Sequence, residues 1–231
     1  MKFLAILHAQ HEGPGLIREW ISLRNHTMDQ FFAWELFPSV SDKSFDALII
    51  MGGPMGANDE SRYPWLVHEK DFIRQAVEDG KKVLGICLGS QLLADCLGAK
   101  VFRNPEPEIG WFPVKKKFFM HSWFPLFDEN ERINVFHWHG DTFDLPDGCV
   151  PLFESEACKI QAFAFEDQLL GLQFHPEADE DLINAFIEHG KDDLRPARYI
   201  QSESRMLNNH KLYAETSKTL LFDLLDDFFI V

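Results

Sequence analysis

The chain has 231 residues, of which 45% are hydrophobic and 13% aromatic, so its composition is typical of a packed domain and argues against intrinsic disorder. Its 37 acidic and 22 basic residues give a formal net charge of −15, which argues against nucleic acid or a bare anionic membrane as a partner. No apolar run is long enough to span a bilayer, and the N-terminal run is too short for a secretory signal. We therefore expect a cytoplasmic protein with reduced thiols.

The first half of the chain alternates between apolar runs and stretches with helical spacing. Such alternation predicts βαβ units and a parallel sheet, whose functional residues gather beyond the carboxyl ends of its strands. The expected elements, in chain order, are a strand at residues 3–8, a helix at 16–23, strands at 30–37 and 46–51, a helix at 65–78, a strand at 82–86 and a helix at 90–97.

The second half has a different pattern, with short apolar runs separated by turn residues. These runs predict antiparallel strands and a hairpin that returns to the sheet. The expected strands are at residues 101–102, 111–114, 133–136, 160–165 and 169–174, followed by a helix at 181–189 and one or two helices with acidic faces within 203–229. We expect a main domain over residues 1–191 and a helical C-terminal appendage over 192–231 that packs on it.

A cysteine stands between two glycines directly after the apolar run at 82–86, in the sequence Gly85-Ile86-Cys87-Leu88-Gly89. A strand–cysteine–helix turn of this kind is the thiol version of a nucleophile elbow. Side chains at 85 or 89 would clash in so tight a turn, and the helix that follows would favour a thiolate. The alternative is a buried structural thiol, which is what we expect of the other three cysteines, Cys96, Cys149 and Cys158.

A histidine and a carboxylate, His175 and Glu177, end the apolar run at 169–174. With Cys87 they supply a nucleophile, its base and the group that orients the base. The alternatives are an ordinary polar residue at a strand end and an acidic residue that favours the start of a helix.

His137, His139 and Asp141 follow another apolar run, and the two histidines would share one face of a strand. A metal site is the alternative interpretation of this cluster. Because no fourth suitably spaced ligand is evident, we predict no metal there, and no phosphate-binding loop occurs in the sequence.

Three separated motifs resemble those of the class I (triad) glutamine amidotransferases and occur in the order found in that family. They are Met-Gly-Gly-Pro at 51–54, Gly-Ile-Cys-Leu-Gly-Ser-Gln at 85–91 and Phe-His-Pro-Glu at 174–177. The resemblance covers roughly the first 190 residues. The motifs at 11–15 and 138–141 are similar, more narrowly, to stand-alone members related to the amidotransferase domains of GMP synthases. The resemblance to this family implies a flavodoxin-like α/β fold with a mostly parallel central sheet flanked by helices.

The resemblance also implies roles for single residues. Cys87, His175 and Glu177 would form the catalytic triad, and the backbone N–H groups of Gly53 and Leu88 would form the oxyanion hole. The substrate-binding residues that it implies are Gly52, Pro54, Gln91, His139, Gly140 and Asp141. It implies neither a cofactor nor a metal.

The implied function is hydrolysis of the γ-carboxamide of glutamine through a thioester, which releases ammonia for an unidentified acceptor on a possible separate synthetase subunit. The chain departs from the family at Trp138, where synthetase domains usually carry Ser or Asn. We expect the indole either to close the pocket or to stack on a larger ligand. A γ-glutamyl peptidase or hydrolase with the same triad is therefore the first alternative, and a catalytically idle binding or regulatory module is the second.

Overall fold

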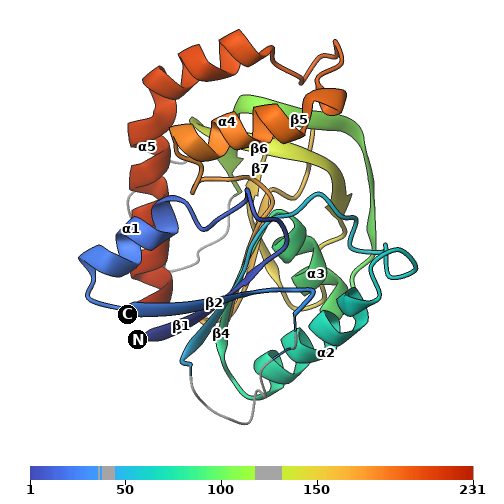
Figure 1. The fold of residues 1–231 in the computed structure, drawn as a ribbon, viewed down its shortest axis with the longest axis vertical. Helices are drawn as coiled ribbons and strands as arrows, with labels where there is room; N and C mark the ends of the chain where they lie inside the picture. Colours follow the sequence, from blue (N-terminus) through green and yellow to red (C-terminus); the bar gives the residue numbers. More distant parts are fainter. Residues whose placement is uncertain (36, 38–44, 118–131, 231) are drawn as a thin grey trace.

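A computed structural model describes residues 1–35, 37, 45–117 and 132–230 (Figure 1). Its elements, in chain order, are β1 (Lys2–Leu7), α1 (Leu16–Leu23), β2 (Thr27–Phe32), β3 (Ala47–Ile50), α2 (Trp65–Glu78), β4 (Lys82–Ile86), α3 (Leu88–Cys96), β5 (Val101–Lys116), β6 (Arg132–Phe143), β7 (Val150–Glu154), β8 (Ala162–Phe165), β9 (Leu169–Leu172), α4 (Glu180–His189), a short 3-10 helix η2 (Lys191–Asp193) and α5 (Glu203–Phe229). No helix of the described segments is both long and apolar enough to cross a membrane.

The strands of the described residues form one mixed sheet in the order β2-β1-β3-β4-β9-β8-β7-β5-β6. Pairing is parallel from β2 to β9 and antiparallel from β9 to β6. The expected α/β fold is confirmed. Its sheet is parallel only in the half that includes β4, because among the described residues no helix stands between β5 and β9 to form the crossover that parallel neighbours need.

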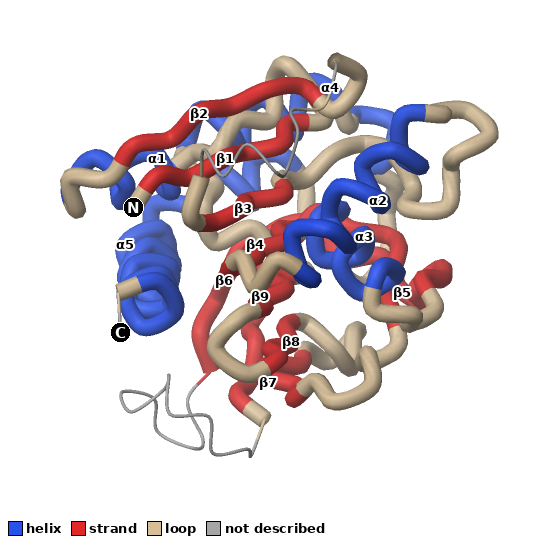
Figure 2. Tube along the Cα trace, turned by 90° about the horizontal axis from the view of Figure 1, so that it is seen from below, coloured by secondary structure: helices blue, strands red, loops and turns tan. Residues whose placement is uncertain are grey.

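Both faces of the parallel half are covered by helices, as Figures 1 and 2 show. Along β1, Phe3 and Ala5 pack in a core with α1 and α5, whereas Leu4 and Ile6 pack in a second core with α2 and α3. Successive residues of a strand point to opposite faces, so a strand with helices on both sides must be apolar throughout. This arrangement explains why β1, β3 and β4 are continuous apolar runs.

The second predicted strand was placed too late in the chain. The run at 30–37 contains the start of a turn: β2 ends at Phe32, and the Glu35 N–H donates to the Phe32 carbonyl at 2.8 Å. Residue 36 lies outside the described residues. β2 is a half-exposed edge strand and lacks the apolar pattern of the central strands. The prediction therefore followed the aromatic residues at its end and beyond it, and placed the strand too late.

The antiparallel half also differs from the sequence prediction. Two predicted runs, at 101–102 and 111–114, belong to the single 16-residue strand β5, which has a register shift between Arg103 and Glu108. Pro105 and Pro107 lie in this irregular stretch, where the ladder is interrupted and missing N–H donors cost little. β7 was not predicted.

The C-terminal residues end in one 27-residue helix, α5, whose N-cap is the Ser202 hydroxyl. Buried leucine and phenylalanine side chains in its second half pack in the same core as Phe3 and Trp20. The Trp20 indole N–H donates to Asp226 at 2.8 Å, which fixes α5 against α1. The end of α5 therefore stabilises the face of the sheet opposite α2 and α3.

A buried ion pair joins the end of β1 to α2. His8 Nε2 lies 2.8 Å from Glu69 Oε1, and both side chains are fully buried. The other ring nitrogen, Nδ1, lies 3.1 Å from the carbonyl oxygen of Gly52, in the turn after β3. Burial lowers the pKa of His8, but the Glu69 carboxylate outweighs this effect, and the net pKa is raised.

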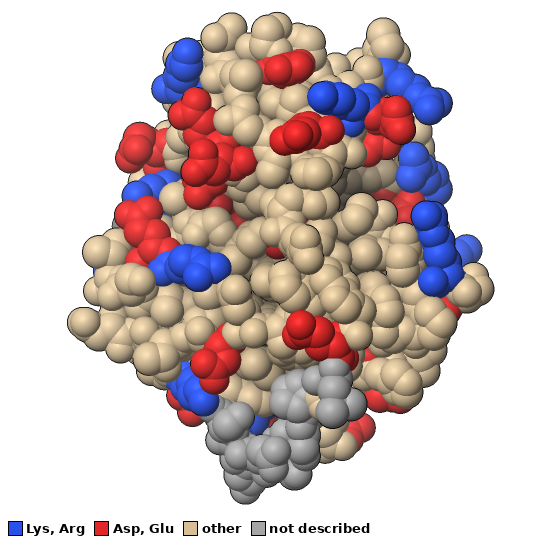
Figure 3. Space-filling view, viewed as in Figure 1, with Lys and Arg blue, Asp and Glu red and all other residues tan. Residues whose placement is uncertain are grey.

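Charged side chains are spread over the face of the molecule that Figure 3 draws. On the face drawn in Figure 3, acidic and basic side chains are interspersed, and basic residues form no broad continuous patch among the described residues of that face. Such a surface agrees with the negative net charge.

The packing of α5 predicts a sharp difference between two leucines of this helix. Leu221 is fully buried, so Leu221→Ala should lower the free energy of unfolding by about 2–5 kcal/mol through lost burial and a cavity. Leu212 is 68% exposed, and Leu212→Ala should change it by less than ~0.5 kcal/mol. Urea unfolding curves measure both values, and equal effects would contradict the packing described.

The His8–Glu69 pair predicts a pH-dependent penalty for Glu69→Gln. Because the folded pKa of His8 lies above its ordinary value of 6.5, the extra stability is complete below that value and is lost as pH rises through the folded pKa. The penalty should approach about 3–5 kcal/mol near pH 6 and shrink as pH rises through the folded pKa of His8.

The matched control for this prediction is Glu19→Gln, which removes a solvent-exposed pair with Lys218 at 2.8 Å. It should cost less than ~1 kcal/mol with no such trend. Chemical unfolding at several pH values tests the sign, and a Glu69→Gln penalty that grows with pH would show it to be wrong.

Candidate active site

Cys87 occupies a strained turn between β4 and α3. Its φ is 48° and its ψ −107°, a region that non-glycine residues rarely adopt. The Cys87 N–H donates to the Leu172 carbonyl at 2.7 Å, and α3 begins at the next residue, Leu88. The thiol therefore lies at the N-terminus of a helix and at the carboxyl edge of the parallel strands.

The glycines on either side of Cys87 have the close contacts expected from the sequence. An ideal Cβ on Gly85 would lie 2.5 Å from the Gly89 carbonyl oxygen, and one on Gly89 would lie 2.0 Å from the Ile50 carbonyl oxygen. Both distances are far shorter than any van der Waals contact. Only glycine lets α3 sit directly against the ends of β3 and β4.

His175 and Glu177 form a buried pair. His175 Nδ1 lies 2.8 Å from Glu177 Oε1, and each side chain is 1% exposed. Burial lowers the pKa of His175, but Glu177 and Cys87 outweigh this effect, and the net pKa is raised well above the ordinary value. Among the described residues His175 Nε2 has no aligned hydrogen-bond partner, which leaves this nitrogen available on the side away from Glu177.

The cysteine and the histidine converge beside Gly52. An ideal Cβ on Gly52 would lie 2.9 Å from His175 Cε1 and 3.6 Å from Cys87 Cβ. The structure therefore brings together Cys87, His175 and Glu177, which are distant in sequence.

The loop before α1 packs on the same group of residues. Gly15, at φ 46°, approaches so closely that a Cβ would lie 2.2 Å from the Glu177 carbonyl oxygen. The same oxygen accepts a hydrogen bond from the Leu16 N–H at 2.9 Å. These contacts explain the glycine at position 15, which the sequence analysis left without a structural role.

The two residues expected to form an oxyanion hole, Gly53 and Leu88, lie in contact. An ideal Cβ on Gly53 would lie 3.1 Å from the Leu88 side chain and 2.5 Å from His8 Cβ. Within the described part of the chain, no acceptor is recorded for either backbone N–H group. Their role as an oxyanion hole stays a prediction.

One open cleft of about 680 Å³ contains most of the residues predicted for the site. The predicted site residues that line this cleft are Gly53, Pro54, Cys87, Leu88, Gln91, His139, Gly140 and Asp141. Gly52, His175 and Glu177 are not part of the lining, and the last two are buried. Further along the cleft, charged side chains from the segment after α4 and from β5 contribute Asp192, Asp193, Arg195 and Arg103.

The sequence analysis missed Gln173. This buried amide donates from Nε2 to Cys87 Sγ at 3.7 Å, and its Oε1 accepts from Gln91 Nε2 at 3.1 Å. Gln91 also approaches the Asp141 carbonyl oxygen at 3.4 Å. Gln173 directly follows β9 and precedes His175 by two residues, and this closeness in sequence to the predicted base was the one signal that pointed to it.

Glu12, within the motif at 11–15, was also assigned no role. It is buried, and burial raises the pKa of its carboxyl group although His175 and His8 partly offset this effect.

The other cysteines differ from Cys87 in their surroundings. Burial raises the pKa of Cys96 to about 12 and that of Cys149 to about 11.

Trp138 is one of the residues that line the cleft, and its indole packs against α4. The expectation that the indole closes the pocket or stacks on a larger ligand stays a prediction. The indole stacks on Phe186 at 5.6 Å between ring centroids, and its N–H donates to Asp193 at 3.3 Å. An ideal Cβ on Gly190 would lie 2.4 Å from the indole. The side chain thus fixes the segment after α4, while its backbone carbonyl approaches Cys87 Sγ at 3.6 Å.

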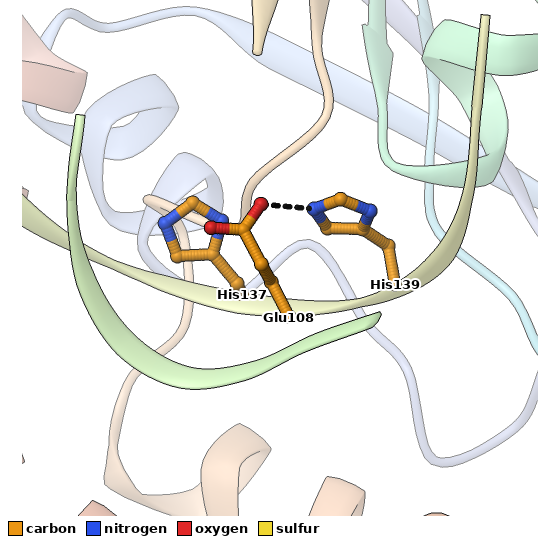
Figure 4. A group of neighbouring side chains, drawn as sticks. All are labelled: Glu108, His137 and His139. Atoms are coloured by element: carbon orange, nitrogen blue, oxygen red, sulfur yellow. Dashed lines mark ion pairs between the residues drawn. The ribbon is translucent and has the colours of Figure 1, made fainter. Parts of the chain in front are cut away.

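The histidines of the 137–141 motif gather around a carboxylate that the sequence analysis did not include. Asp141 is directed to Arg103, 3.4 Å away. Instead, Glu108 of β5 lies between His137 and His139, as Figure 4 shows. The antiparallel register pairs Glu108 with His139, which only the folded hairpin could reveal.

The model of the class-I glutamine amidotransferase family matches residues 23–187. A glutamine amidotransferase-like protein of Salmonella typhimurium, YfeJ, is 32% identical over 221 residues, 89% of each chain. A GMP synthase of Aliivibrio fischeri is 31% identical over 64% of this chain but 27% of the synthase. Gamma-glutamyl peptidase 4 of Arabidopsis thaliana is 27% identical over 66% of this chain and 62% of the peptidase.

Among solved structures, a glutamine amidotransferase from Thermotoga maritima superposes with a TM-score of 0.87 at 33% identity. The superposition covers 99% of this chain and 97% of that one. Together with the match of the family model to more than half of the sequence, these similarities show that the chain belongs to the class-I glutamine amidotransferase family.

Proposed function

We propose that the chain hydrolyses a γ-glutamyl amide, in the first instance the γ-carboxamide of glutamine, through Cys87, His175 and Glu177. The observation that carries the proposal is the buried His175–Glu177 pair at 2.8 Å, beside a cysteine at a strained helix N-terminus. A thiol nucleophile requires this combination: a base, a group that orients the base, and an electropositive position for sulfur.

In the first half of the reaction, Cys87 Sγ attacks the carboxamide carbon, and the Gly53 and Leu88 N–H groups bind the resulting oxyanion. Such a donor typically contributes about 3–4 kcal/mol of transition-state stabilisation. His175 then protonates the departing nitrogen, so that ammonia leaves and a thioester remains on Cys87. The buried Glu177 carboxylate holds the imidazole and stabilises its charged form.

In the second half, His175 removes a proton from water, and the resulting hydroxide attacks the thioester carbon. The C–S bond breaks, glutamate is released and the thiol is regenerated. Glutamine and water thus give glutamate and ammonia, and this scheme uses only groups that the chain supplies.

The cleft indicates what kind of group the substrate carries beyond the γ-amide that is hydrolysed. Its volume of about 680 Å³ falls within the range of roughly 300–1,000 Å³ typical of small-molecule sites, so it accommodates more than one amino acid. Charges of both signs, from Asp192, Asp193, Arg195 and Arg103, complement the ammonium and carboxylate groups of an amino-acid end. These features, with the peptidase relative, support a γ-glutamyl peptide as the alternative substrate.

The released ammonia would be used by an unidentified acceptor on a separate synthetase subunit. The GMP synthase relative is described as glutamine-hydrolysing, and this chain matches 27% of its length. The four free cysteines support a reducing, cytoplasmic setting. The intact triad speaks against the alternative of a catalytically idle module.

Cys87→Ser should keep the fold and lower turnover by at least ~10³-fold, because a hydroxyl lacks the reactivity of a thiolate at neutral pH. Ammonia and glutamate release measure turnover. Diazo-oxo-norleucine, a glutamine-like electrophile, should label Cys87 alone, because burial raises the pKa of each other thiol to about 11 or 12.

Cys96→Ser serves as the control and should retain both activity and labelling. Mass spectrometry that finds another cysteine modified first, or full activity in Cys87→Ser, would refute the assigned nucleophile.

The purified chain should hydrolyse free glutamine weakly. Activity should rise with a partner subunit or be exceeded by turnover of a γ-glutamyl peptide, because the cleft extends beyond the space of one amino acid. Steady-state kinetics on glutamine and a γ-glutamyl dipeptide series decide this. Efficient use of glutamine, faster than any peptide and insensitive to candidate synthetases, would contradict the prediction.

A further inference from the structure

Glu108, His137 and His139 form a buried cluster beside the cleft, from β5 and β6. The candidate ligand atoms of the three side chains all lie within 4.8 Å of one another. All three residues are at least 96% buried. In Figure 4 the carboxylate lies between the two imidazole rings. The mechanism proposed above does not use this cluster.

Backbone carbonyl groups fix the orientation of both imidazoles. His139 Nδ1 lies 3.0 Å from the Asp141 carbonyl oxygen, and His137 Nε2 lies 3.3 Å from the Phe112 carbonyl oxygen. A carbonyl only accepts hydrogen bonds, so these two nitrogens must carry protons. In neutral imidazoles the opposite nitrogens, His139 Nε2 and His137 Nδ1, then present lone pairs to the interior of the cluster.

Those lone pairs meet another acceptor. Among the described residues, His137 Nδ1, His139 Nε2 and Glu108 Oε1 are buried without an aligned hydrogen-bond partner. His139 Nε2 approaches Glu108 Oε2 at 3.2 Å, and the same oxygen accepts from Gln161 Nε2 at 2.5 Å. Unpartnered buried acceptors each cost about 1–3 kcal/mol, and a cation bound between them would remove this cost.

We propose that Glu108 and the two imidazoles of His137 and His139 bind a Zn²⁺ ion. Two imidazole nitrogens and one carboxylate oxygen are a common zinc donor set, with bonds of roughly 2.0–2.2 Å. Tetrahedral geometry then needs donor atoms roughly 3.4 Å apart, which modest side-chain rotations reach from the present spacing. The carbonyl groups of Asp141 and Phe112 are the outer acceptors that orient zinc-binding histidines.

Two clefts border the cluster. His139 lines the cleft that contains Cys87, and Glu108 lines a second cleft of about 320 Å³. Zinc would tie β5 to β6 at the point where His139 and Gly140 form the wall of the cleft. The proposal stands whether or not the proposed hydrolysis is correct.

The test uses the full chain with Cys87→Ala, which removes a competing thiolate. After treatment with a chelator, the protein should bind one equivalent of Zn²⁺ by calorimetry and show a higher Tm with zinc. Glu108→Gln and His137→Gln should each weaken zinc affinity by at least ~100-fold and abolish the Tm rise. His68→Gln, at an exposed histidine of α2, is the control and should change neither.

Co²⁺ provides a readout that needs no ligand variant and therefore does not depend on how well such variants fold. The Cys87→Ala chain should give the absorption spectrum of a tetrahedral site with nitrogen and oxygen donors and without a thiolate-to-cobalt band, and Zn²⁺ should displace the cobalt. Absence of micromolar or tighter binding overturns the proposal. Unchanged affinity in the folded Glu108 and His137 variants, or a thiolate band, also overturns it.

Discussion

The strained backbone of Cys87 is the constraint on which the site depends. A positive φ at a non-glycine residue persists only where its surroundings allow no alternative. Here the Leu172 carbonyl holds the N–H of Cys87, while Gly85 and Gly89 allow α3 to sit against the ends of β3 and β4. Relaxation of the turn would have to move α3 away from the sheet. The energy of packing two hydrophobic cores therefore maintains the position of one sulfur atom.

Buried imidazole–carboxylate pairs fix the backbone around that sulfur. They are His8–Glu69 and His175–Glu177. Each histidine belongs to a segment next to the cleft, and each carboxylate restricts the orientation of its ring. In a medium of low dielectric constant such pairs are costly to break, so they specify geometry more than they add stability. The amide Gln173 extends this polar layer to the thiol itself.

The antiparallel half of the sheet supplies the rest of the cleft. The His175 N–H donates to the Phe136 carbonyl at 2.7 Å, so β6 returns to the edge where the parallel strands end. The Trp138 indole then packs against Phe186 and places the segment after α4 at the rim. Asp192, Asp193 and Arg195, fewer than twenty positions after the Phe-His-Pro-Glu motif, thus line the cleft.

The sequence by itself determined the α/β fold, the family and the positions of Cys87 and His175, because apolar runs and glycine-flanked motifs reflect local backbone requirements. It also explained the glycines around the cysteine. Only the tertiary structure decided that Glu108 faces His139, that Gln173 contacts Cys87 and that the Trp138 indole stacks on Phe186. Those contacts depend on strand register and on the return of a long hairpin, which bring together residues whose spacing in the chain carries no signal of proximity.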